Sequence, residues 1–238
     1  FKNSDYDATV LLCEVDNPSR FGIADIENEK IIKITEKPKN PESNLAVTGI
    51  YFLTPIIFEI IDRLKPSWRN ELEITDALDN LLKENNNISY EKITDYWKDT
   101  GTPDDILHAN GEIIRKHPEF VKRRSVNKPN IPEKLNLIGD VILGSNCEFD
   151  TDVIIQGPVI IGDNCKIRSS TKIGPNVSIG NDSIICISNI ENSIIMENCE
   201  INSSTKIKDS IIANNSKITD KDGSEKVFLL GEGSKISL

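Results

Sequence analysis

The sequence predicts an α/β layer fold followed by a parallel β-helix, and two patterns lead to this expectation. Over roughly the first 124 residues, strand-like and helix-like runs alternate, which is typical of α/β layer folds. From Leu137 onward, an aliphatic or aromatic residue recurs at every sixth position. A helix or an ordinary strand has a different period, whereas hexapeptide repeats are a signature of β-helices. We therefore expect two domains, residues 1–124 and 125–238.

Hydrophobic patterning predicts the elements of the first domain. Three short apolar runs rich in β-branched residues predict strands: 8–15, 31–37 and 46–54. Three runs with apolar residues at helical spacing predict helices: 55–64, 74–85 and 103–124. Pro55 and Pro103 stand where a first helical residue is expected, and Thr75 and Asp76 are candidate caps of the middle helix.

The second domain opens with a proline-containing linker, 125–135, and then repeats. Nine residues fall at strict six-residue steps: Leu137, Leu143, Phe149, Ile155, Ile161, Ile167, Ile173, Ile179 and Ile185. The step slips near Ile190 and then resumes. In a coil of triangular cross-section these residues point inward, and small or polar residues take the corners. Because a continuous aliphatic core explains every repeat residue, we expect a scaffold or oligomerisation role.

Composition excludes some classes of function. The net charge of −10 argues against nucleic acid as the main partner. No apolar run approaches the roughly 18–20 residues that a membrane span needs. The five cysteines are odd in number and widely spaced, which favours reduced thiols in the cytoplasm. The chain starts at Phe1 rather than at a methionine, and we expect it to be a fragment whose amino-terminal part is absent.

Three short segments carry residues suited to chemistry. Glu36 and Lys37 end a predicted strand; the carboxylate can bind sugar hydroxyls and the ammonium can neutralise phosphate, or the pair is a solvated strand end. Gly49, inside a predicted strand, allows the close approach of a ligand or marks a bulge. Asp99 follows a strand-like stretch, where it can bind Mg²⁺ or close an Asx turn.

Five segments occur in a recognisable order: RFGIADI, EKP, AVTGIYF, RNELEITD and WKDTGT. Their order and approximate spacing resemble those of the sugar-1-phosphate nucleotidylyltransferases, above all the long form of glucose-1-phosphate thymidylyltransferase with a hexapeptide tail. The resemblance runs from residue 1 to the end. It implies the carboxyl-terminal portion of a Rossmann-like nucleotidyltransferase domain, followed by a left-handed parallel β-helix. The family's glycine-rich loop, its base contacts and its first metal aspartate lie upstream and do not occur in this chain.

The resemblance also implies roles for individual residues. Gly22 matches a glycine that lies against the bound sugar, and Glu36 an acid that binds sugar hydroxyls. Lys37 matches a lysine beside the phosphosugar, with a catalytic role, and Val47 a residue whose backbone contacts the sugar. Asp99 matches the second metal-binding aspartate and is expected to be both the metal ligand and a catalytic residue.

A further segment, with Arg69, Glu71 and Glu73, lies near the site in the family, and Arg69 is expected to bind substrate. The activity implied is transfer of dTMP from dTTP to glucose 1-phosphate, with release of pyrophosphate and Mg²⁺ as cofactor. We expect this chain alone to be inactive, and a homo-oligomer is compatible with the tail. The expected substrates are a sugar 1-phosphate and a nucleoside triphosphate, with neither nucleic acid nor membrane as a partner.

Two alternatives stay open. One is acyl transfer by the β-helix, since many hexapeptide acyltransferases have this fold. Those enzymes usually need a histidine base, and both histidines, His108 and His117, precede the repeats. The other is a non-catalytic regulatory or structural subunit.

Overall fold

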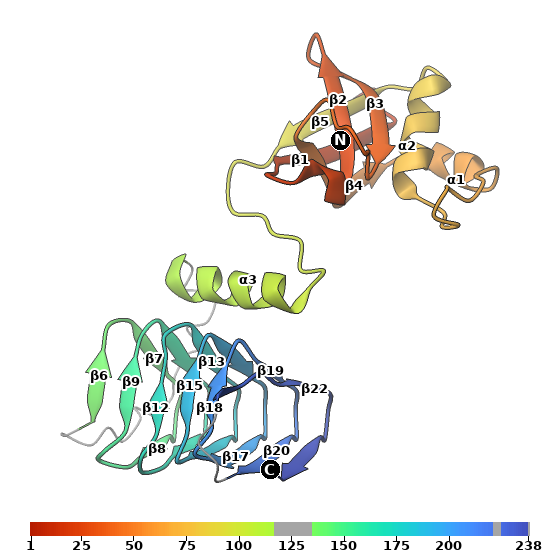
Figure 1. Ribbon diagram of the computed structural model, residues 1–238. Coiled ribbons are helices and arrows are strands. Elements are labelled where there is room, and N and C mark those ends of the chain that lie inside the picture. Colours follow the sequence, from red (N-terminus) through yellow and green to blue (C-terminus); the bar gives the residue numbers. More distant parts are fainter. Residues whose placement is uncertain (117–134, 221–224, 238) are drawn as a thin grey trace. The chain divides into compact units, whose positions relative to one another are not determined.

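The computed structural model describes residues 1–116, 135–220 and 225–237 (Figure 1). Within these limits the chain forms two compact units, Phe1–Asp99 and Thr100–Leu238. The first is an α/β unit and the second is a parallel β-helix with one helix. Both parts of the expected fold class are thereby confirmed.

The first unit is built on a five-stranded sheet with the order β3-β2-β4-β1-β5. Its strands are β1 (Ala8–Glu14), β2 (Gly22–Glu27), β3 (Lys30–Glu36), β4 (Leu45–Leu53) and β5 (Ile88–Lys92). A short 3₁₀ helix, Pro18–Arg20, precedes β2. Strands β2 and β3 form an antiparallel hairpin, β1 and β4 are antiparallel, and β1 and β5 are parallel. Patterning alone did not predict β2 or β5 as strands.

Helices α1 (Ile56–Ile61) and α2 (Ile74–Lys83) lie together on one side of this sheet (Figure 1). The buried face of α2 contains Ala77, Leu78 and Leu81, which join the core of the unit. Since β3 is an edge strand, its outer N–H groups lack a strand partner. Asp79 Oδ1 accepts the N–H of Ile34 at 3.0 Å, so α2 covers that edge.

Gly49 lies where β4 bulges against β1. The register of the two strands shifts between Val10 and Leu12, and Gly49 has a φ of +82°. Thr48 Oγ1 donates to the carbonyl of Leu11 at 2.9 Å across the irregularity. A residue with a side chain is strained at this φ, so the backbone of the bulge accounts for the glycine.

The second unit coils through three parallel sheets (Figure 1). One face contains β7 (Val141–Leu143), β10 (Val159–Ile161), β13 (Val177–Ile179), β16 (Ser193–Ile195), β19 (Ile211–Ile212) and β22 (Leu229–Leu230). The next contains β8 (Glu148–Phe149), β11 (Lys166–Ile167), β14 (Ile184–Cys186), β17 (Glu200–Ser203), β20 (Lys217–Asp220) and β23 (Lys235–Ser237). The third contains β6 (Asn136–Ile138), β9 (Ile154–Gln156), β12 (Lys172–Ile173), β15 (Asn189–Glu191), β18 (Lys206–Lys208) and β21 (Glu225–Lys226).

Stacked isoleucines and small polar residues fill the inside of the coil. Ile155, Ile173, Ile190 and Ile207 pair in succession on one face and are fully buried. At one corner a second stack consists of Cys147, Cys165, Ser183, Cys199 and Ser216. Each of its side chains donates to a carbonyl of the following coil, which satisfies a buried acceptor. All five cysteines of the chain are free thiols, and burial raises the pKa of Cys199.

The repeat length changes at the corners of the coil. Equivalent side chains are 18 residues apart at Asn146 and Asn164, 16 at Asn181 and Glu197, and 17 at Asn198 and Asn215. Ile187, at a corner inside the shortest stretch, is exposed and has a φ of +52°. The slip seen in the sequence is therefore absorbed in a turn and leaves the strands in register.

Helix α3 (Pro103–Lys116) belongs to the second unit. Ser178 donates to Asn110 Oδ1 at 2.6 Å, and Arg115 Nη2 donates to Asn176 Oδ1 at 3.2 Å. Leu107, Gly111 and Ile114 are its buried face. The division between compact units falls at Asp99, because α3 packs on the coil, and the expected domain boundary at residue 124 stays a prediction. The rest of the expected helix, 117–124, and the linker at 125–134 lie outside the described residues.

Among the described helices, none is long and apolar enough to cross a membrane.

The coil offers a direct test of its inward ladder. Ile185 is 0% exposed and its neighbour Ile184 is 36% exposed. Replacing Ile185 by alanine leaves a cavity, so we expect Ile185→Ala to lower the free energy of unfolding by about 2–5 kcal/mol. Ile184→Ala is the matched control and should lower it by less than about 1 kcal/mol. Urea unfolding followed by circular dichroism measures both; equal effects would contradict the inward orientation of position 185.

Candidate functional site

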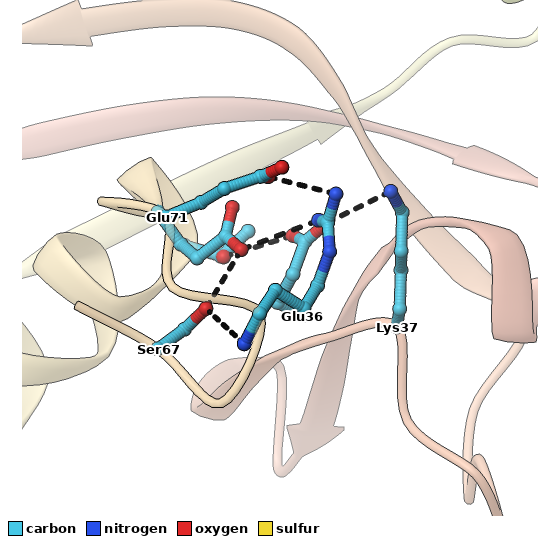
Figure 2. Close-up of polar contacts among 7 residues, drawn as sticks. Glu36, Lys37, Ser67 and Glu71 are labelled. Carbon is cyan, nitrogen blue, oxygen red and sulfur yellow. Dashed lines mark hydrogen bonds and ion pairs between the residues drawn. The ribbon is translucent and has the colours of Figure 1, made fainter.

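The candidate site gathers around the carboxylate of Glu36, the last residue of β3 (Figure 2). Its Oε2 accepts a hydrogen bond from Thr75 Oγ1 at 2.9 Å. Its Oε1 lies 3.4 Å from Arg69 Nη1 and 3.8 Å from Lys37 Nζ. Gly22 is the strand partner of Glu36 in the β2–β3 hairpin. The structure therefore brings four of the expected site residues to one place: Gly22, Glu36, Lys37 and Arg69.

The loop before α2 holds Arg69 with a network of its own. Arg69 Nη2 lies 2.7 Å from Glu71 Oε2, and Arg69 Nη1 lies 3.2 Å from Glu73 Oε1. Ser67 Oγ donates to Glu73 Oε1 at 3.0 Å and accepts the N–H of Arg69 at 3.1 Å. Figure 2 shows the side chains of Glu36, Lys37 and Glu71 gathered in one place, with Lys37 paired to Glu36. The arginine is thus fixed by three carboxylates and one hydroxyl.

Carboxylates outnumber cations in this cluster. Glu36, Glu71 and Glu73 face Arg69 and Lys37. Burial, and then the charge of Glu36, raise the pKa of the Tyr51 phenol. Tyr51 therefore keeps its proton more firmly than a free tyrosine and can act as a neutral donor beside the cluster. An anion that binds here must be attracted by Arg69 and Lys37, because the three carboxylates repel a negative charge.

Thr75 occupies the space that a side chain at position 22 would take. A Cβ atom there would collide with the methyl carbon of Thr75 and lie 3.1 Å from Glu36 Oε2. The φ of Gly22 is outside the left-handed region, so its backbone conformation alone does not demand glycine. Close approach of Thr75 explains the glycine. Contact of Gly22 with a sugar stays a prediction.

Val47 lies one position beyond the pair formed by Ala46 and Ile23, on the side of Gly22. Its side chain is buried in the core and it pairs with Leu12 on β1. Only its backbone is therefore available near Gly22, and backbone contact with a ligand stays a prediction.

Asp99 does not end a strand, contrary to expectation. Strand β5 ends at Lys92, and the segment that follows has no regular structure up to α3. The segment nevertheless returns to the site, because the ring of Trp97 packs edge-on against Phe21 with centroids 5.8 Å apart. The Phe21 carbonyl accepts the N–H of Lys37 at 2.9 Å. Asp99, two residues after Trp97, is exposed.

Asp99 carries a carboxylate, which is the kind of oxygen group that Mg²⁺ prefers. Residues 1–116, 135–220 and 225–237 contain no group of three or more His, Cys, Asp or Glu side chains that could hold a metal ion together. Mg²⁺ is commonly held by one or two carboxylates together with substrate phosphates, so an exposed single carboxylate fits such a role.

Sequence reasoning missed Ser67, Thr75 and Trp97 as parts of the site. It took Thr75 for a helix cap, but the N-cap position of α2 is Glu73, and Thr75 donates to Glu36. Trp97 was read only as part of a motif. The sequence offers one indication that they belong to the site. Each lies within two positions of a residue that the motifs point to: Arg69, Glu73 or Asp99.

Both parts of the chain match models of known protein families. The family model described as nucleotidyl transferase matches residues 1–116, which include the whole cluster. Residues 1–116 belong to the nucleotidyl transferase family. A second model, the GMPPB C-terminal domain, matches residues 155–237 of the coil. Members of the nucleotidyl transferase family are enzymes that act on sugar phosphates and nucleoside triphosphates, and they generally use a divalent metal.

Three curated relatives illustrate the similarity. Low-salt glycan biosynthesis nucleotidyltransferase Agl11 from Haloferax volcanii is 40% identical over 82% of this chain. Glucose-1-phosphate thymidylyltransferase from Streptomyces antibioticus is 34% identical over 97% of it. Bifunctional protein GlmU from Methanococcus aeolicus is 43% identical over 82% of it. The chain spans 54%, 64% and 46% of the lengths of these three relatives, respectively.

The network around Arg69 predicts unequal effects of two glutamates. Glu73 is 8% exposed and contacts both Ser67 and Arg69, whereas the Glu71 side chain is 57% exposed. We expect Glu73→Gln to lower the free energy of unfolding by about 1–3 kcal/mol, because the partly buried donors of Ser67 and Arg69 lose a charged acceptor. Glu71→Gln, the control, should change it by less than about 1 kcal/mol, as for an exposed ion pair. Urea unfolding measures the loss of stability in both variants. A larger loss for Glu71→Gln than for Glu73→Gln would contradict the network.

Proposed function

We propose that the protein containing this chain transfers a nucleotidyl group to a sugar 1-phosphate, forming a nucleotide-sugar and pyrophosphate. The observation that carries the proposal is the convergence of Glu36, Lys37 and Arg69 in a chain of the nucleotidyl transferase family. We propose dTTP and glucose 1-phosphate as substrates, since the relative from Streptomyces antibioticus is named glucose-1-phosphate thymidylyltransferase.

Each member of the cluster has chemistry suited to the sugar phosphate. The Glu36 carboxylate accepts hydrogen bonds from sugar hydroxyls, and the ammonium of Lys37 and guanidinium of Arg69 offset phosphate charge. The backbone at Gly22 and Val47 borders the same place. Lys37 is the more exposed cation, 38% against 23% for the Arg69 side chain, so it is the first that an incoming phosphate meets.

The reaction is an in-line displacement. A phosphate oxygen of the sugar 1-phosphate attacks the α-phosphorus of the triphosphate, and pyrophosphate leaves with the bonding electrons. The chain's residues form no covalent bond with substrate; they hold the attacking phosphate and screen its charge, so catalysis rests on positioning and electrostatics. Asp99 would bind Mg²⁺, which when present neutralises charge on the phosphates. Lys37 lowers the repulsion between the two phosphates as they approach.

The coil is assigned a scaffold role. Its inward residues are accounted for by the aliphatic core, and the sequence of residues 135–237 contains no histidine to serve as the base of an acyltransferase. We propose that it supports a homo-oligomer by side-by-side packing. A cytoplasmic location agrees with the five free thiols.

The test is an assay of the full-length protein with a panel of nucleoside triphosphates and sugar 1-phosphates, in the presence of Mg²⁺. The expected products are pyrophosphate and one nucleotide-sugar, identified by mass spectrometry. Absence of product from every combination, with a folded protein, would favour the non-catalytic subunit. Acetyl transfer from acetyl-CoA in the same preparation would favour the acyltransferase.

We predict that Glu36→Gln raises the KM for the sugar 1-phosphate at least about tenfold, because a charged acceptor of sugar hydroxyls is lost. The KM for the triphosphate should stay within about twofold, since the proposal assigns Glu36 to the sugar phosphate alone. Glu27→Gln, at the exposed end of the neighbouring strand β2, is the control and should leave both constants unchanged. Steady-state kinetics gives both constants, and an unaltered sugar phosphate KM removes the role of Glu36.

We predict that Asp99→Asn lowers kcat at least about a hundredfold at saturating Mg²⁺, because the metal loses a charged ligand. The fold should be unaffected, as Asp99 is exposed. Asp95→Asn, exposed in the same segment, serves as the control. The measurement is kcat against Mg²⁺ concentration for the three proteins. Near-normal turnover of the Asp99 variant would reject the metal assignment.

A further inference from the structure

We propose that Thr75 is a positioning residue of this site: its hydroxyl orients the Glu36 carboxylate, and its methyl group is the reason that position 22 is glycine. The inference rests on the proposed function in so far as it concerns how the sugar-binding carboxylate is held. It extends that function to a residue of helix α2 whose side chain contacts the Glu36 carboxylate.

The first step of the argument is where the hydroxyl of Thr75 points. Thr75 is the second residue of α2 and is 3% exposed. A threonine in the first turn of a helix often bonds to nearby backbone, as a cap or to a preceding carbonyl. Here its hydroxyl instead donates to Glu36 Oε2 at 2.9 Å, on a strand 39 residues earlier. The buried Thr75 hydroxyl therefore donates its hydrogen bond to a residue of the site.

The second step concerns which groups contact each oxygen of the Glu36 carboxylate. The two cations, Arg69 and Lys37, approach Oε1, and Thr75 approaches Oε2. A carboxylate has about four acceptor positions, so each oxygen keeps capacity for a ligand hydroxyl. The cations alone would draw the carboxylate toward themselves. Thr75, a neutral donor, holds the second oxygen in place without cancelling the charge that the ligand needs.

The third step concerns Gly22. Its φ is one that any residue adopts, yet a Cβ would collide with the Thr75 methyl carbon. Gly22 is also the strand partner of Glu36, so one threonine side chain contacts both members of the pair. A larger residue at 22 would push Thr75 off and release the carboxylate. Positions 22 and 75 should therefore behave as a coupled pair.

A purely structural role would make Thr75 important for its shape alone. Two variants separate shape from hydrogen bonding. Thr75→Val keeps the branched shape and removes the hydroxyl, whereas Thr75→Ser keeps the hydroxyl and removes the methyl. In the full-length protein we expect Thr75→Val to raise the KM for the sugar 1-phosphate about tenfold, the factor for a hydrogen bond to a charged group. Thr75→Ser should stay within about threefold of the wild type.

The triphosphate KM should be unaffected in both variants, and this distinguishes positioning of Glu36 from general damage. If Thr75→Val keeps the wild-type KM for the sugar phosphate, or if Thr75→Ser is impaired as severely as Thr75→Val, the positioning role is overturned. A wild-type protein without nucleotidyl transfer activity would instead reject the proposed function.

The coupling of positions 22 and 75 has a test that needs no activity. Overpacking by Gly22→Ala should lower the melting temperature by roughly 5 °C. The double variant Gly22→Ala/Thr75→Ser lacks the colliding methyl group and should recover most of this loss. In an active enzyme the same pair should show recovery of the sugar phosphate KM. A double variant that is no more stable than Gly22→Ala overturns the steric part of the inference, whatever the activity of the wild type.

Discussion

The first unit depends on the docking of helix α2 across the edge strand β3. Buried Leu78 and Leu81 attach the helix to the core, and Asp79 satisfies an N–H of the strand that would otherwise lack a partner. This contact brings the start of α2, with Thr75, and the loop before it, with Arg69, over the end of β3. The site is thus a consequence of how a helix covers a sheet edge, because every contact to Glu36 from this segment follows from that placement.

The two cations of the site differ in how strongly carboxylates of the protein engage them. Arg69 pairs with three carboxylates, so a phosphate that approaches it competes with them. Among the residues that the structure describes, the ion pair of Lys37 is with Glu36 and is longer, at 3.8 Å. Since the strength of a contact between charges falls with distance, Lys37 loses less when it turns to a ligand. We therefore propose that Arg69 mainly holds the loop, whereas Lys37 is the cation that is freer to meet a substrate anion.

Much of the fold could be predicted because its signals are local. The strands near Ala8 and Leu45 are short apolar runs, and the ladder of the coil has its own period. What could not be predicted depends on contacts between distant residues. Strand β2 mixes apolar and acidic positions and is held mainly by pairing with β3, and α3 joins the coil through Asn110 and Ser178. Of the site, the family motifs indicated Glu36 and Lys37, but no local pattern shows which way a threonine hydroxyl turns.

The unequal coils have a consequence for how such a chain can change in length. Strands of adjacent coils stay aligned although the spacing between equivalent side chains varies from 18 to 16 residues. The difference is taken up at turns such as the one at Ile187, where the side chain is exposed. Loss or gain of residues there leaves the inside and outside of every strand unchanged, whereas a single deletion within a strand would exchange them. The coil can therefore grow, shrink or accept inserted segments at its corners over evolutionary time, and an engineered peptide is best grafted there.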